Sequence, residues 1–144
     1  MASSTPQNLQ NHARYVPLYH FVLFAILVAN LVYAVIRLWH FDVHSLFQFL
    51  VAVALVLITW FARAFALTVQ DRVIRLELRL RLQSLAPDLT ARFDQLAVGQ
   101  MTALRFAGDD ELPALTRDVL DGKLVGSADI KKRVQHWRAD HLRA

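Results

Sequence analysis

The chain has 144 residues, 56% of them hydrophobic, with no cysteine and a formal net charge of +4. The lack of cysteine excludes a disulfide framework, a thiolate metal site and a cysteine nucleophile. Only Arg14, Arg37 and Arg63 of the 16 basic residues precede residue 70, so apolar and charged residues are segregated along the chain. This segregation favours a membrane anchor followed by a polar module over one soluble domain.

Residues 1–16 are predicted to form a polar N-terminal tail, because Ser, Thr, Gln and Asn dominate them. Pro17 suits the first position of a helix, where its missing N–H costs nothing. Around it, His12, Arg14 and His20 stand among aromatic residues, a composition typical of the membrane interface. An alternative is that these three side chains hold a lipid headgroup or a quinone-like ligand.

Two apolar runs, residues 18–38 and 46–67, are each long enough for a helix that crosses the roughly 30 Å hydrocarbon layer of a bilayer. A soluble core would need a far larger domain to bury two such runs. A signal peptide cleaved near Ala34 is the other alternative, but the apolar stretch continues past Ala34. We therefore predict a transmembrane hairpin over residues 17–70.

Basic residues flank the two runs unequally. Arginines precede the first run and follow the second, whereas residues 39–45 between them contain no Lys or Arg. The positive-inside rule therefore predicts an inner-membrane protein with both termini in the cytoplasm. Five arginines near the predicted cytoplasmic surface are expected to contact lipid headgroups, Arg63 by snorkelling: Arg14, Arg63, Arg72, Arg75 and Arg79.

Few residues suggest chemistry. His40, Asp42 and His44 could supply three metal ligands from the hairpin loop, but the loop offers no fourth ligand and we predict no metal site. His136 and Asp140 stand one helical turn apart, and a surface hydrogen bond between them is favoured over an acid–base pair. Glycine-rich phosphate loops, nucleophile elbows and zinc-protease motifs are missing from the sequence. We expect no catalytic residue, no cofactor and no enzyme activity.

The second apolar helix is predicted to continue beyond the membrane to Leu85, because residues 68–85 contain no Gly or Pro and Pro87 then ends it. Alternating leucines in this stretch also fit a strand. Two acid–base pairs at i, i+4 favour the helix: Asp71 with Arg75, and Glu77 with Arg81.

This extension has two apolar faces, nearly opposite each other on a helix. One contains Val73, Leu76 and Leu80, and the other contains Ile74, Leu78, Leu82 and Leu85. The chain's own C-terminal part can cover one face, and the other then requires a second subunit or a different protein. We predict a protein interface among these seven residues, and coverage of both faces by the chain itself is the alternative.

Residues 71–144 are predicted to form a cytoplasmic helical module. Short amphipathic helices are expected over residues 88–97, 99–107 and 110–120, and a last one begins at Ser127 with Ile130, Val134, Trp137 and His141 on one face. About 60 residues make a marginal bundle, so docking on the extension or on a second copy is expected. Nucleic acid is not an expected partner, because aromatic platforms do not interleave with the basic residues.

Several motifs resemble an uncharacterised family of short bacterial two-span membrane proteins. They are Asn11-His12-x-Arg14-x-x-Pro17-x-Tyr19-His20, Gln70-Asp71-Arg72-x-Ile74-Arg75-Leu76-Glu77, Ala103-Leu104-Arg105-Phe106-Ala107, and Ile130-Lys131-Lys132 leading to Trp137-Arg138-Ala139-Asp140. The resemblance covers nearly the whole chain. It implies a location in the bacterial inner membrane and carries no assigned activity.

The leading hypothesis is an integral membrane interaction or scaffold protein, or a small accessory subunit of a larger membrane complex. Its expected partners are membrane lipids and either further copies of itself or another membrane protein. An oligomeric channel or transport component is the alternative. Polar residues of the two runs would line its path: Asn30, Arg37, Gln48, Thr59 and Arg63.

Overall fold

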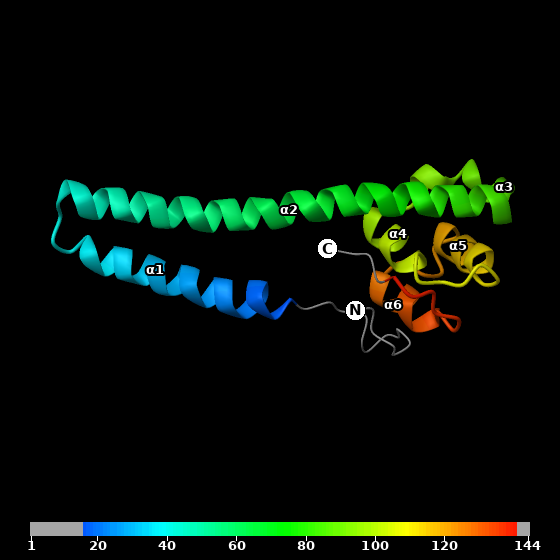
Figure 1. Ribbon diagram of the computed structural model, residues 1–144. Coiled ribbons are helices and arrows are strands. Elements are labelled where there is room, and N and C mark those ends of the chain that lie inside the picture. The colour runs from blue at the N-terminus through cyan, green and yellow to red at the C-terminus, as the bar shows by residue number, and fades with distance from the viewer. Residues whose placement is uncertain (1–15, 141–144) are drawn as a thin grey trace. The chain divides into compact units, whose positions relative to one another are not determined.

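The computed structural model describes residues 16–140, and every regular element in that range is a helix (Figure 1). Two long apolar helices come first and shorter helices follow, so the predicted all-α class is confirmed. The described residues divide into two compact units, residues 16–66, here called the hairpin unit, and residues 67–140, here called the helical module. The sequence suggested a boundary between residues 70 and 71, slightly later along the chain.

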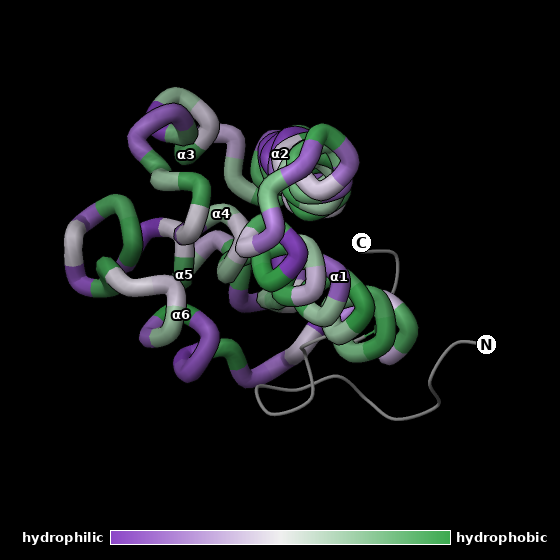
Figure 2. Tube along the Cα trace, turned by 90° about the vertical axis from the view of Figure 1, so that its left-hand side faces the viewer, coloured by the Kyte–Doolittle hydropathy of each residue, from purple (hydrophilic) through white to green (hydrophobic). Residues whose placement is uncertain are grey.

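The hairpin unit consists of a π-helical segment, η1 (Leu18–Leu23), the helix α1 (Phe24–Arg37) and the first part of α2 (Val43–Leu85). The stretch Leu18–Arg37 and the helix α2 are both long and apolar enough to cross a membrane. Within this unit, α1 and α2 run antiparallel and are joined by a short loop (Figure 1). Hydrophobic residues lie on most sides of α1 (Figure 2), a pattern typical of helices in membranes.

Small side chains are among the buried residues of the hairpin unit. Ala34 of α1 is fully buried, as are Ser45 and Ala52 of α2. Small residues let two helix backbones approach closely, which is how helices commonly pack in membranes. Two other alanine pairs with helical spacing, Ala25 with Ala29 and Ala62 with Ala66, are exposed instead.

In the helical module, α2 continues to Leu85 as predicted. Five short helical elements follow it: α3 (Pro87–Thr90), η2 (Phe93–Gln95), α4 (Val98–Leu104), α5 (Leu112–Leu120) and α6 (Ser127–Arg133). The predicted helix over residues 88–97 is therefore two shorter pieces, because Arg92 adopts φ −101° and ψ 2° between them.

The core of the module joins α2 to the short helices. Leu78 and Leu82 of α2 belong to the same buried cluster as Phe93, Leu112 and Ile130. The expectation that the short helices dock on the extension of the second apolar helix is thus confirmed. Docking on α2 supplies an apolar surface that helical elements of three to nine residues cannot supply for one another.

The prediction that the last helix runs on to residue 141 is wrong. α6 ends at Arg133, and Val134 leaves the helix with ψ 122°. The next residues pair with the segment after α4: the Gly108 amide donates to the carbonyl of His136 and the Arg138 amide to that of Phe106, each over 2.8 Å. These tertiary hydrogen bonds replace the helical ones. His141 lies outside the described residues.

Candidate functional site

One apolar face of α2 is used inside the helical module. Ile74, Leu78 and Leu82 are buried, and the last two belong to the module's core. Leu85, at the end of the helix, is partly exposed. The buried residues of this face are therefore covered by the chain itself and are not accessible to a second protein.

The opposite face of α2 carries a row of exposed aliphatic side chains. Val69, Val73, Leu76 and Leu80 keep 60%, 51%, 59% and 56% of their surface, and we call them the exposed ridge. Isolated apolar residues are common on protein surfaces, but a continuous row on one helix face is typical of an interaction site. Of the predicted interface residues, Val73, Leu76 and Leu80 lie on this ridge. Val69 was not included in the predicted interface, because it stands close to the end of the second apolar run.

Arginines flank one side of the exposed ridge. Arg72, Arg75 and Arg79 line, together with Leu76, a surface depression of about 310 Å³. Arg75 forms an ion pair with Asp94 over 2.6 Å rather than with Asp71, and the guanidinium of Arg79 lies 5.8 Å from the ring centre of Phe93. The depression therefore combines a basic rim with an apolar floor.

Arg81, which was predicted to pair with Glu77, is instead the main polar link between α2 and the rest of the module. Its side chain is only 15% exposed, and its Nε and terminal nitrogen donate to Asp109 over 2.9 and 2.6 Å. It also donates to the carbonyls of Arg105 and Ala107, over 3.2 and 2.7 Å. Arg81 stands next to Leu82, which lies on the buried side of α2. This position was the feature of the sequence that could have predicted its contacts with the rest of the module.

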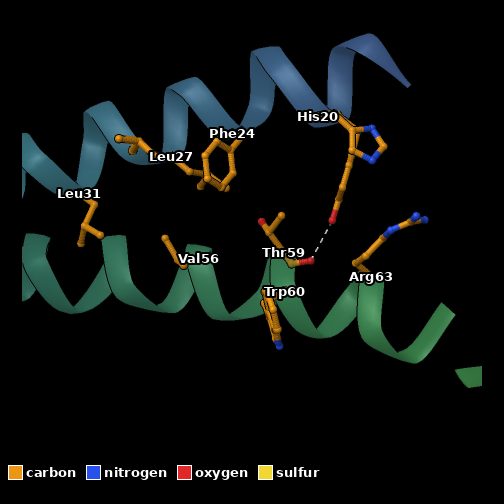
Figure 3. A pocket seen from close by; sticks show the side chains of 10 residues that line it. His20, Phe24, Leu27, Leu31, Val56, Thr59, Trp60 and Arg63 are labelled. Atoms are coloured by element: carbon orange, nitrogen blue, oxygen red, sulfur yellow. Dashed lines mark hydrogen bonds between the residues drawn. The ribbon is translucent and has the colours of Figure 1, made fainter. Parts of the chain in front are cut away.

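A groove of about 410 Å³ opens within the hairpin unit, between α1 and α2. Figure 3 shows His20 and Arg63 near one end of it and Leu31 at the other. The remaining walls are mainly apolar: Phe24, Leu27, Val28, Val56 and Trp60. A mainly apolar trough with basic side chains at one end suits an amphipathic molecule, such as a lipid, by shape and polarity.

The polar end of the groove is tied to η1. The Tyr19 hydroxyl donates to the Thr59 carbonyl over 3.1 Å and so joins the two helices. The Nδ1 atom of His20 lies 3.0 Å from the Val16 carbonyl oxygen, so its ring is held against the first turn. π-helical turns are rare and frequently occur at functional sites. Of the residues proposed to grip a headgroup, His20 lies here, whereas His12 and Arg14 fall outside the described residues.

The structure does not bring together the three candidate metal ligands of the hairpin loop, His40, Asp42 and His44. Asp42 caps α2, since its carboxylate accepts the Ser45 amide while its own amide donates to the Ser45 hydroxyl over 3.0 Å. The Ser45 amide is the main reason that the pKa of Asp42 is lowered. Within residues 16–140, no three His, Cys, Asp or Glu side chains are placed to hold a metal ion.

His136 and Asp140 were predicted to pair on one helix, and this prediction is wrong because α6 ends before them. His136 Nδ1 instead contacts the Asp110 carboxylate, and Asp140 pairs with Arg105 over 3.3 Å. The contact with Asp110 raises the pKa of His136 and lowers that of Asp110. Both side chains are largely exposed, so this pair is a surface link between the C-terminal segment and the loop before α5.

The family of unknown function DUF6526 matches the sequence over residues 1–144. No curated protein and no solved structure matches the sequence.

Proposed function

We propose that the chain, which belongs to this family of unknown function, is a membrane-anchored interaction protein. The hairpin unit serves as the anchor, and the helical module presents the exposed ridge to another protein chain. Its role is that of a scaffold or a small accessory subunit in a larger membrane complex, without catalytic activity of its own.

The composition of the hairpin unit supports the anchor. Its two helices are long and apolar enough to cross a bilayer, and large apolar side chains stay exposed along them. Exposed apolar surface on all sides of a helix is unfavourable in water and favourable in lipid. The location we propose is the bacterial inner membrane, with both termini in the cytoplasm and with Arg63, Arg72, Arg75 and Arg79 near lipid headgroups.

The observation that carries the interaction role is the exposed ridge. Burying a large aliphatic side chain completely contributes about 1.5–3 kcal/mol, and each residue of the ridge is roughly half exposed. Covering four of them would therefore contribute several kcal/mol to binding. The short helices of the module already occupy the other face of α2, so the ridge is available to a different chain.

A photo-crosslinking residue in place of Leu76 tests this role in native membranes. We expect a defined protein adduct, because Leu76 lies in the middle of the ridge. The matched control is the same residue in place of Val125, which is also exposed but lies outside α2 and should give no such adduct. If position 76 yields only lipid adducts, or the same products as position 125, the interaction role is wrong.

A channel or transport component is the second candidate, favoured by the placement of Arg63 and Thr59 along the groove between the two helices. Two helices cannot enclose a pore, so several copies would be needed. Reconstituted protein should then conduct ions in liposomes, and Arg63→Ala should abolish the flux without changing the number of copies. Absence of flux from an assembled oligomer would exclude this role.

A further inference from the structure

The exposed ridge has the spacing of a coiled-coil seam. Val69, Val73, Leu76 and Leu80 follow one another at intervals of four, three and four residues. This is the alternation of the a and d positions of a heptad, with Val73 and Leu80 at a and Val69 and Leu76 at d. In the sequence the same intervals lead back to Ala66 and Ala62, whose small side chains permit close approach. The exposed ridge of one copy can therefore pack against the same ridge of a second copy.

The charges beside the ridge are complementary to those of a second copy. Arg72 precedes Val73 and holds a g position, and Glu77 follows Leu76 and holds an e position. In a parallel two-stranded coiled coil, a g residue of one helix meets the e residue five positions later on the other. Arg72 of each copy would therefore meet Glu77 of the other, forming two symmetric ion pairs.

Both charged side chains are available for this contact. Arg72 and Glu77 are exposed, and neither takes part in an ion pair within residues 16–140. In an antiparallel pair of helices, g positions face each other, which would set Arg72 and Arg79 against arginines of the partner. The charge pattern thus selects the parallel arrangement.

We infer that two copies of this chain associate through a parallel coiled coil of their exposed ridges, with Arg72 of one copy paired with Glu77 of the other. The inference rests on the proposed function, because two hairpins inserted the same way in one membrane hold their α2 helices parallel. Tethering to one membrane also raises the effective concentration of the two ridges, so a seam of about two to three heptads suffices. The module's own helices cover the opposite face of α2 and leave the ridge accessible.

Disulfide crosslinking in membranes tests the seam directly, because the chain has no cysteine of its own. Val73→Cys should yield a disulfide-linked dimer on oxidation, since two a positions face each other across a parallel coiled coil. Val125→Cys is the matched control, exposed and away from α2, and should yield little dimer. Equal crosslinking at the two positions would overturn the inference.

Charge exchange in the Val73→Cys background tests orientation and pairing. Arg72→Glu alone or Glu77→Arg alone places like charges together at both pairs and should lower the dimer yield roughly fivefold. When the two variants carry different tags and share one membrane, their mixed dimer regains two opposite-charge pairs and should recover the original yield. Failure of the mixed dimer to recover would overturn the inference. The helix content of each variant should match that of the parent, since neither residue takes part in an ion pair within residues 16–140.

The two proposals fail in different ways. If position 76 crosslinks to a different protein and Val73→Cys gives no dimer, the interaction role stands and self-association is wrong. If neither experiment detects any protein contact, both are wrong.

Discussion

Arg81 holds α2 against the loop that follows α4, through hydrogen bonds to one carboxylate and two carbonyl groups. Arg81→Ala leaves those partly buried carbonyl groups without the hydrogen bonds that Arg81 donates. Because hydrogen bonds to charged groups contribute about 1.5–3 kcal/mol, we expect the free energy of unfolding of the module to fall by that amount. Denaturant unfolding of the full chain in mild detergent measures this loss in the free energy of unfolding.

Arg133→Ala is the matched control for that prediction. Arg133 is an exposed arginine of the same module without an ion pair in the described part of the chain, so its removal should change the free energy of unfolding by less than about 0.5 kcal/mol. Equal losses for the two variants would show that Arg81 is not a structural link.

The contact between His136 and Asp110 predicts a dependence of stability on pH. Hydrogen bonding to Asp110 raises the pKa of His136 above 6.5, so its contribution is complete below pH 6.5 and is lost as pH rises through the raised pKa. The same bond lowers the pKa of Asp110 below 3.8, so that contribution is present above pH 3.8 and is lost as pH falls through the lowered pKa. The pair therefore stabilises the module most in mildly acidic solution.

Thermal unfolding of His136→Gln checks this prediction. The difference in melting temperature between parent and variant should be largest near pH 5 to 6 and should shrink as pH rises past the raised pKa of His136. In an Asp110→Asn background, where only the weaker attraction of Glu111 remains, His136→Gln should give a difference that varies much less with pH. A pH-dependent difference in that background would assign the effect to another group.

Side-chain pairing was the least predictable feature at the residue scale. The sequence suggested Asp71 for Arg75 and Glu77 for Arg81, both one turn away, yet these arginines bind Asp94 and Asp109. Pairs at i, i+4 contribute only about 0.2–0.5 kcal/mol, and a long arginine side chain readily reaches a better partner once the helices pack. Choice of partner therefore depends on the tertiary fold.

At the scale of single elements, the two faces of α2 should respond differently to the same substitution. Leu78→Ala removes a buried core side chain and should lower the free energy of unfolding by about 2–5 kcal/mol. Leu76→Ala truncates an exposed side chain of the ridge and should lower it by less than about 1 kcal/mol, while weakening association. Denaturant unfolding and crosslinking of both variants separate these effects. A large loss of stability for Leu76→Ala would mean that the ridge serves the module itself.

The long helices were predictable because their evidence is local. A span of 20 mainly apolar residues and an uninterrupted stretch without Gly or Pro can be recognised without tertiary information, and α2 ends at Leu85 as the position of Pro87 indicated. The C-terminal segment was not predictable in this way. Its apolar residues are spaced as in a helix, but the Glu111 carboxylate accepts the amides of Gln135 and His136 and holds the chain out of a helix. That acceptor is 24 residues away in sequence.

At the scale of the whole molecule, the two units differ in the side chains that they expose. The hairpin unit exposes many large apolar side chains on helices long enough to cross a membrane. The helical module buries its own core on α2 and leaves one ridge uncovered. The candidate interface could be narrowed to α2 from sequence, but only the packing of the short helices showed which face stays free.

Cysteine labelling of the hairpin loop and of the module tests the central claim, that a membrane hairpin holds the module in the cytoplasm. Val43→Cys, at the start of α2 beside the hairpin loop, and Val125→Cys in the module are both exposed valine positions in a chain without native cysteine. In intact spheroplasts, a membrane-impermeant maleimide should label Val43→Cys, and it should label Val125→Cys only after lysis. Labelling of Val125→Cys before lysis, or equal labelling of both positions in intact spheroplasts, would contradict the account.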